Sequence, residues 1–217
     1  MTRGFIDGEY QDGELRGINF LVGRRGYGKT TEMNRLLSQC TGGILFFDAL
    51  SKHGGMFAGY VMFSEPGRLE EYLRVNRGRR FHIMYQPRGG NLDEHFAAVC
   101  KIVVAFGWMI FGVDELDKLC GMRFGESRMP QAFYDIVNYG RHHRVSVIAT
   151  ARRPQGVPTG FRDESELRVF GLKPGKALEA IRTEIGDEAA SQVAQLPKYQ
   201  YLHFVEDEEP VLCQYPL

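Results

Sequence analysis

The chain has 217 residues, of which 43% are hydrophobic, so it can bury a full core, and we expect one domain over 1–217. Its 27 Lys and Arg residues balance 27 Asp and Glu residues, which excludes a global basic field and leaves only a local basic surface for nucleic acid. No apolar run is long enough for a membrane span, and no basic-then-apolar segment indicates a signal peptide. The four Cys residues form no C-x-x-C pair, which favours core thiols in a reducing, intracellular compartment over a zinc site.

Residues 1–15 are rich in Gly and acidic turns, and we interpret them as a lead-in segment. After them, 18–22 is an apolar run typical of a buried strand, and 31–40 places apolar residues at helical spacing. The segment between them, 23–30, matches the phosphate-loop pattern G-x-x-x-x-G-K-[ST]. Glycines let such a loop turn its N–H groups toward phosphate oxygens, and the N-terminus of the next helix adds positive potential.

The phosphate loop predicts an ATP site with bound Mg²⁺. Lys29 is expected to reach the β- and γ-phosphates and to act in catalysis, and the Thr30 hydroxyl is expected to bind Mg²⁺. The nucleotide-binding residues predicted in this way are Gly23, Arg24, Arg25, Gly26, Tyr27, Gly28, Lys29, Thr30 and Thr31. The alternative is a glycine-rich turn that matches the pattern by chance in a chain with 26 Gly.

The next segments alternate between strand and helix patterns. The apolar run 44–47 predicts a strand that ends at Asp48, and 51–59 predicts a Gly-rich mobile loop. A helix follows from Pro66, with an arginine cluster in 74–80 that we interpret as a solvated helix end, the alternative being a DNA site. The strand 81–85 follows, with His82 as a half-buried residue and not a metal ligand, and Asn91 is predicted to cap a helix that runs up to Gly107.

Two carboxylates end the predicted strand 108–115. Ligands bind beyond the carboxyl ends of the strands in open α/β sheets, which is where Asp114, Glu115 and the phosphate loop are expected to lie. Asp114 is predicted to belong to the Mg²⁺ shell. Because adjacent strand residues alternate faces, Glu115 is predicted to point elsewhere and to polarise the attacking water. The alternative for this pair is a helix cap after a core strand.

The remaining pattern is a helix from Pro130 that closes at 141–144, followed by a strand at 145–150 that leads to Arg152 and Arg153. Strands that alternate with helices indicate an α/β fold with a doubly wound, mainly parallel sheet. We expect a nucleotide-binding core over 16–160 and a C-terminal part of the same domain over 161–217, which ends in a short β-hairpin.

The order of these motifs resembles the FtsK–HerA superfamily of additional-strand P-loop ATPases, and most closely the genome-packaging ATPases of tailless, internal-membrane DNA viruses. The residues that carry the resemblance are 23–30, 113–115, 140–142 with 145–150 and 152–154, 170–175 and 196–197, so it covers nearly the whole chain. Cellular relatives carry an N-terminal barrel or membrane segments, which this sequence lacks. Relatives place Gln before the Arg-Pro pair as a γ-phosphate sensor, and here that position is Arg152, so Thr150 or Arg152 takes that role or Arg152 serves the neighbouring subunit.

The resemblance implies an additional-strand, RecA-like fold and an ATPase stimulated by double-stranded DNA. It also implies a homo-oligomeric, hexameric ring with DNA in its channel, a capsid vertex or portal protein as partner, and a place in the host cytoplasm or on the virion. An arginine supplied in trans would stabilise the transferring phosphoryl group. The candidates for this catalytic role are Arg141, Arg144 and Arg152, and the alternative for each is an ordinary surface arginine.

Two loops are candidates for lining the DNA channel, where they would bind DNA without sequence specificity. Segment 51–59 offers Lys52 and His53, and 121–129 offers Arg123 and Arg128 after the Asp114-Glu115 strand, which makes the second loop the stronger candidate. The function expected is packaging of a viral double-stranded DNA genome into a preformed capsid. The alternatives are a phage assembly or extrusion ATPase and a nucleotide-dependent assembly switch that moves no DNA.

Overall fold

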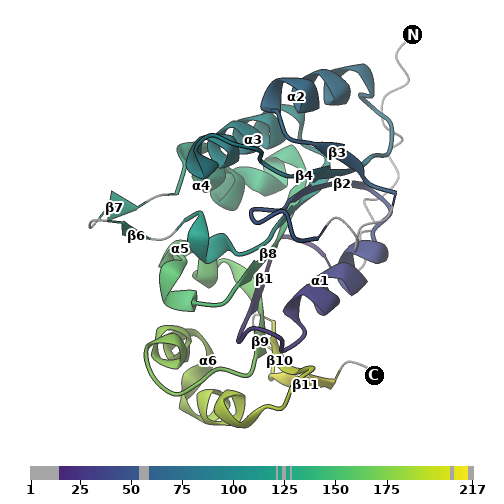
Figure 1. The fold of residues 1–217 in the computed structure, drawn as a ribbon. Coiled ribbons are helices and arrows are strands. Elements are labelled where there is room, and N and C mark those ends of the chain that lie inside the picture. Colours follow the sequence, from purple (N-terminus) through teal and green to yellow (C-terminus); the bar gives the residue numbers. More distant parts are fainter. Residues whose placement is uncertain are drawn as a thin grey trace.

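The computed structural model describes residues 15–53, 59–120, 122–123, 126–127, 129–205 and 208–214. Its main feature is a nine-stranded sheet with the strand order β11-β10-β9-β1-β8-β5-β2-β4-β3 (Figure 1). The strands of this sheet are β1 (Ile18–Val22), β2 (Gly43–Phe47), β3 (Val61–Phe63), β4 (His82–Tyr85), β5 (Met109–Val113), β8 (Val145–Ala151), β9 (Ser165–Phe170), β10 (Gln200–Phe204) and β11 (Val211–Gln214). A separate two-stranded hairpin joins β6 (Met122–Arg123) to β7 (Glu126–Ser127).

The sheet confirms the predicted fold class. All strands from β9 to β3 run parallel, and β10 and β11 add the expected C-terminal antiparallel hairpin. Strand β8 lies between β1, which precedes the phosphate loop, and β5, which precedes Asp114. This inserted strand is the additional strand that the resemblance implied. Because the central strands are parallel, their carboxyl ends meet at one edge of the sheet.

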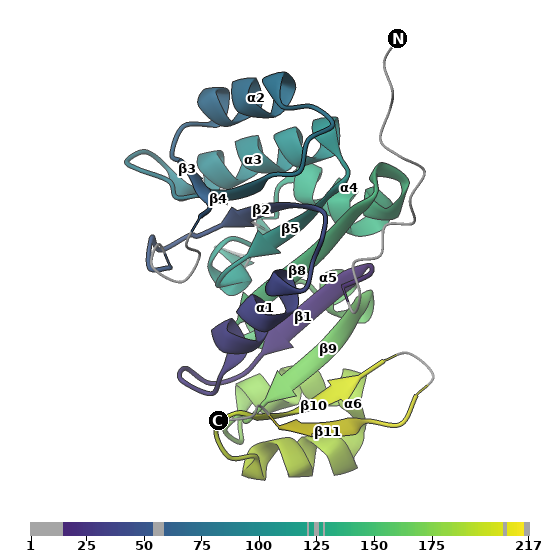
Figure 2. The ribbon, with the colours of Figure 1, turned by 90° about the vertical axis from the view of Figure 1, so that its right-hand side faces the viewer.

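Helices cover both faces of the sheet, but unequally. Figures 1 and 2 show α1 (Lys29–Ser38) by itself on one face, where its Met33, Leu36 and Leu37 pack with Leu21 and Phe46. The opposite face packs against the other helices, which are α2 (Pro66–Val75), α3 (Leu92–Phe106), α4 (Gln131–Tyr139), α5 (Thr159–Asp163) and α6 (Lys176–Gln195). Both faces of the central parallel strands β2, β5 and β8 are thus largely buried, as their continuous apolar sequences predict, whereas the edge strand β3 is partly exposed. Among the described residues, no helix has the length and apolar character to cross a membrane.

Several predictions hold at the level of single elements. Asn91 caps α3, since its side chain accepts a hydrogen bond from the Asp93 N–H. Cys40, Cys100 and Cys120 are buried as predicted, and Cys213 is half-buried. The arginines of the 74–80 cluster are exposed around the end of α2, which is compatible with a solvated helix end and with the alternative of a DNA site. The lead-in 1–15 falls outside the described residues except for Leu15, which is buried.

A buried polar network ties the C-terminal hairpin to α1. Glu32 of α1 accepts a hydrogen bond from the Tyr201 hydroxyl of β10 at 2.8 Å, and it pairs with Arg35. Arg168 of β9 donates to Asn19 of β1 at 2.7 Å and lies 3.9 Å from Glu32. Burial alone would raise the pKa of Glu32, but the Arg35 and Tyr201 hydrogen bonds outweigh it, and the pKa lies below its usual value. The residues after 160 therefore pack directly on the nucleotide-binding core.

Candidate active site

The phosphate loop connects β1 to α1 (Lys29–Ser38) and is shaped by close contacts that only glycine permits. A Cβ on Gly23 would lie 2.6 Å from the Cβ of Phe170, and one on Gly28, which caps α1 at φ 105°, would lie 3.0 Å from the Tyr199 ring. The loop also receives backbone support, because the Arg24 N–H donates to the Gly171 carbonyl and the Tyr199 N–H donates to the Tyr27 carbonyl.

Gly171, in the 170–175 motif, has a structural reason to be glycine. A Cβ on Gly171 would lie 2.7 Å from the Tyr27 ring and 2.8 Å from the Leu196 carbonyl oxygen. The glycine at this position thus lets the C-terminal part approach the phosphate loop closely. Phe170 and Gly171 contact the phosphate loop directly, and Leu196 packs behind Gly171.

Lys29 is folded onto its own loop. Its Nζ donates to the carbonyl oxygens of Gly23 at 2.8 Å and Arg24 at 3.0 Å, and the residue is 7% exposed. Burial lowers the pKa of Lys29 to about 8, against the attraction of Asp114. Phosphate oxygens can replace the two carbonyls as acceptors, so the ammonium fits the predicted role. Thr30 and Thr31 follow in the first turn of α1, both half-buried, and Arg25 and Gly26 are exposed.

Asp114 lies directly after β5 and is held by the neighbouring strand. The Thr150 hydroxyl at the end of β8 donates to Asp114 Oδ1 at 2.6 Å, and the Glu115 N–H donates to Thr150 Oγ1 at 3.1 Å. Burial would raise the pKa of Asp114, but hydrogen bonds from His53 and Thr150 outweigh it and keep the pKa below its usual value. The carboxylate is therefore ionised, which suits the predicted role in binding Mg²⁺.

Glu115 points away from Asp114 for a different reason than the sequence suggested. Strand β5 ends at Val113, so strand alternation does not apply, and Glu115 instead adopts a left-handed turn conformation with φ 52°. Its Oε2 lies 2.6 Å from Lys118 Nζ and 3.1 Å from Arg152 Nη2. The adjacent Asp117 accepts a hydrogen bond from the Arg152 N–H at 3.3 Å, and burial raises the Asp117 pKa. The predicted base is thus held by two cations of its own chain.

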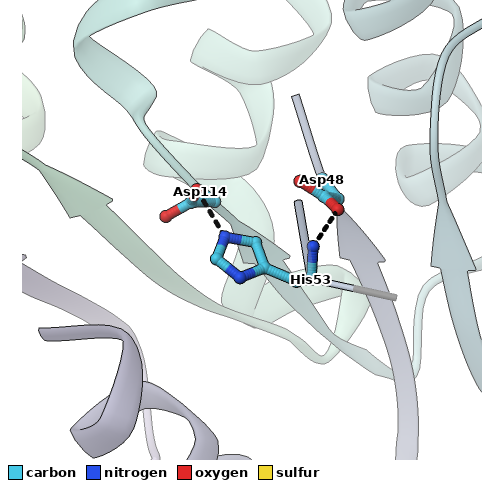
Figure 3. Close-up of side chains that lie close together, drawn as sticks. All are labelled: Asp48, His53 and Asp114. Carbon is cyan, nitrogen blue, oxygen red and sulfur yellow. Dashed lines mark hydrogen bonds and ion pairs between the residues drawn. The ribbon is translucent and has the colours of Figure 1, made fainter. Parts of the chain in front are cut away.

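His53, one of the two residues proposed for a DNA contact in 51–59, lies against the carboxylates of the site. Its backbone N–H donates to Asp48 Oδ2 at 2.9 Å, and its ring Nε2 lies 2.9 Å from Asp114 Oδ2 (Figure 3). The hydrogen bond to Asp114 raises the pKa of His53, although burial opposes it. The physical reason for the inward orientation is a turn, in which the Ser51 N–H donates to the Asp48 carbonyl and Ser51 has φ 53°. Lys52, the other candidate in this loop, is exposed.

The three candidate trans arginines lie in two places. Arg152 lines a cavity of about 300 Å³ beside the phosphate loop, together with Arg24, Arg25, Arg153, Leu172, Lys173 and Ala177. This concentration of cations suits a polyphosphate. Arg141 and Arg144 lie before β8, at the amino ends of the parallel strands and opposite the phosphate loop. Arg144 stacks on the Trp108 ring at 3.9 Å, and Arg141 is exposed.

The second DNA-loop candidate is only partly described. The backbone of β6 and β7 forms an antiparallel hairpin, in which residue 123 lies opposite residue 126 in the strand register. Figure 1 shows this hairpin extending away from the sheet. Arg128 lies outside the described residues.

Sequence reasoning missed Asp48, Lys118 and the inward position of His53. One signal was present for Asp48, because it follows β2 as Asp114 follows β5, and polar residues at the carboxyl ends of neighbouring parallel strands meet at one edge. Lys118 and His53 carried no such signal, because their positions depend on turns.

The strand order, the loop between β1 and α1, and Asp114 after β5 define the fold of a P-loop NTPase. No protein-family model and no curated protein matches this sequence. Among solved structures, the genome packaging NTPase B204 from Sulfolobus turreted icosahedral virus 2 in complex with sulfate matches with a TM-score of 0.73 and 16% identity, over 94% of this chain and 98% of that chain. Its complex with AMPPCP matches with a TM-score of 0.72 and 16% identity, over 94% and 99%.

A third match is B204, the DNA-packaging ATPase from Sulfolobus Turreted Icosahedral Virus, with a TM-score of 0.68 and 17% identity, over 93% of this chain and 98% of that chain. The resemblance to the packaging ATPases of tailless viruses is thereby confirmed at the level of the fold. At these identities the likeness establishes the shared fold, and the roles of individual residues rest on the geometry described above.

Proposed function

We propose that this protein is an ATP-hydrolysing DNA translocase that packages a viral double-stranded DNA genome into a preformed capsid. The observation that carries the proposal is the convergence of Lys29, Asp114 and Glu115 at one sheet edge, in a fold that matches nearly all of a genome packaging NTPase. Complexes of that NTPase with AMPPCP and ATP-gammaS support a nucleoside triphosphate as the substrate.

The residues have distinct roles in the proposed reaction. The phosphate-loop N–H groups and Lys29 bind the triphosphate, and Thr30 and Asp114 would hold Mg²⁺, which neutralises phosphate charge. Glu115 accepts a proton from water as the water oxygen bonds to the γ-phosphorus, while the bond from that phosphorus to the β–γ bridging oxygen breaks and ADP leaves. Lys118 and Arg152 hold the Glu115 carboxylate before the reaction. Thr150 positions Asp114 and the Glu115 backbone together.

The proposed assembly is a homo-oligomeric, hexameric ring in the host cytoplasm, docked on a capsid vertex or portal protein. In such a ring Arg141 or Arg144 approaches the nucleotide of the next subunit, because both lie at the sheet edge opposite their own phosphate loop. Contacts to DNA are made to phosphates, since a packaging motor must move along any sequence.

The test is steady-state ATP hydrolysis with and without double-stranded DNA. The native protein is expected to hydrolyse ATP faster when DNA of any sequence is added. Lys29→Ala should lose ATP binding, whereas Glu115→Gln should still bind ATP and lose hydrolysis by about 10²-fold or more, because only the base is removed. Lys101→Ala on α3 serves as a control for the loss of a surface cation.

The outcomes separate the candidate functions. Hydrolysis that does not respond to DNA would favour the nucleotide-dependent assembly switch and contradict a translocase. Glu115→Gln turning over near the native rate would show that another group acts as the base.

A further inference from the structure

We propose that Asp48, His53 and Asp114 form a binding site for a divalent transition-metal ion that fills in the absence of nucleotide. Each residue offers one ligand atom, and these atoms all lie within 4.8 Å of one another. Figure 3 shows the two carboxyl groups, from the ends of β2 and β5, close to His53. No other such cluster of three is found among the described residues.

Asp48 supplies an observation that is independent of the clustering. The residue is fully buried, and its Oδ2 accepts hydrogen bonds from the His53 N–H and, at 2.8 Å, from Gln86 Nε2. Its Oδ1 is also buried but has no hydrogen-bond partner. A buried carboxylate oxygen without a partner is costly, so the fold holds an acceptor ready for a ligand. A cation at Oδ1 supplies the missing partner.

The remaining ligands are held in a similar way. Asp114 Oδ1 accepts the Thr150 hydroxyl proton, which leaves Oδ2 directed at His53 Nε2. Hydrogen bonds from groups behind the ligands, here from Gln86 and Thr150, orient carboxylates in metal sites. Entry of an ion replaces the contact between His53 and Asp114 with two bonds to the metal, and the proton on Nε2, if present, leaves to solvent.

The donor set selects the class of ion. Two carboxylate oxygens and one imidazole nitrogen suit Mn²⁺, Co²⁺ or Zn²⁺, whereas Mg²⁺ prefers oxygen ligands throughout. The charge of such an ion also balances the two carboxylates. This site is distinct from the Mg²⁺ shell proposed for the nucleotide, although the two share Asp114. Its existence does not depend on hydrolysis or on DNA.

The test uses Mn²⁺ and the full chain without nucleotide or DNA. Electron paramagnetic resonance of a Mn²⁺ titration is expected to show one ion taken up per chain, and pulsed measurements should detect the coupling of that ion to an imidazole nitrogen. His53→Asn should abolish the nitrogen coupling and weaken Mn²⁺ binding by about tenfold or more. Asp48→Asn should weaken binding to a similar extent.

His82→Asn is the matched control, because it removes a histidine from β4 outside the cluster and should leave the signal unchanged. Circular dichroism checks that each variant is folded. If Asp48→Asn, at a buried position, does not fold, the His53→Asn variant, at a half-buried position, provides the test. No Mn²⁺ uptake by the native chain, uptake without nitrogen coupling, or equal binding by His53→Asn would each overturn the proposal. Because no nucleotide is present, these results are independent of the proposed ATPase activity.

Discussion

The guanidinium of Arg152 lies 3.1 Å from the carboxylate of Glu115 in the same chain. The side chain of Arg152 is 35% exposed and that of Glu115 is 14% exposed, and Arg152 also lines the cavity beside the phosphate loop. We therefore expect Arg152 to orient the proposed base Glu115 within its own chain, whereas contact with the nucleotide of a neighbouring subunit remains a prediction for Arg141 and Arg144.

Mixed assemblies distinguish the two tasks. Arg152→Ala should lower hydrolysis about tenfold, because Glu115 keeps only Lys118 as a partner. Mixing this variant with Lys29→Ala should give no more than the averaged rate of the two proteins, since the base and Arg152 belong to one chain. The same mixture made with Arg141→Ala or Arg144→Ala is the comparison, and a rate above the average there identifies the trans arginine. A gain in the Arg152 mixture would contradict the assignment.

Nucleotide binding should depend on pH through Lys29, whose pKa is lowered to about 8. Phosphate favours the ammonium form, so ATP binding above this pH requires uptake of a proton, and the affinity falls toward tenfold per pH unit. Isothermal titration calorimetry in buffers of different ionisation enthalpy should report proton uptake that is small well below the Lys29 pKa and approaches one proton well above it. Lys29→Arg stays charged and should show no uptake. The absence of uptake at pH 9 in the native protein would refute the lowered pKa.

Gly171→Ala should destabilise the protein and weaken ATP binding. The new Cβ would meet the Tyr27 ring and the Leu196 carbonyl, and overpacking of this kind costs about 1–3 kcal/mol. Urea unfolding measures the cost. Gly160→Ala in α5 is the control, because a Cβ at that position would have no atom within 4 Å, and it should leave stability unchanged or raise it slightly. Equal stability of the two variants would show that the loop does not need this close approach.

The DNA contacts predicted in 121–129 can be tested by salt dependence. Removal of Arg123 and Arg128 together should reduce the slope of log K against log salt by about 0.9 for each phosphate that the loop no longer neutralises, and it should reduce DNA stimulation of hydrolysis. ATP turnover without DNA should stay near normal. Arg77→Ala with Arg79→Ala, at the exposed end of α2, removes the same charge elsewhere. A double mutant at 123 and 128 that responds to DNA as the native chain does would exclude this loop.

The parts of the fold that could be predicted are those with local signals. The segment 18–30 combines an apolar strand with a motif whose residues are adjacent in sequence, so β1 and the phosphate loop were predictable. Strand β3 was not, because it has three residues with partly exposed side chains. Helix α6 was obscured by Gly186, which has a non-helical conformation inside it. Tertiary packing decides such elements.

The site was predictable where residue type alone defines the chemistry, as for Lys29 and Asp114. It was not predictable where a turn decides the direction of a side chain. Glu115 takes its position from a left-handed backbone that hydrogen-bonds to Thr150, and His53 takes its position from the turn at Ser51. The turn at Ser51 is local, but the side-chain partners are distant in the sequence: Thr150 lies 35 residues from Glu115, and Asp114 lies 61 residues from His53, so a single sequence does not reveal these contacts.

The support of the phosphate loop by Gly171 and Tyr199 has a consequence for biosynthesis. A ribosome completes the loop early, but it adds these two supporting residues only long afterwards, together with β9, which pairs with β1. Pairing over such a long stretch of chain is slow compared with local folding. A nascent chain that ends between the phosphate loop and Gly171 therefore carries the whole nucleotide motif without the contacts that shape it in the folded protein, and we expect it to bind ATP weakly until 171–199 have been added.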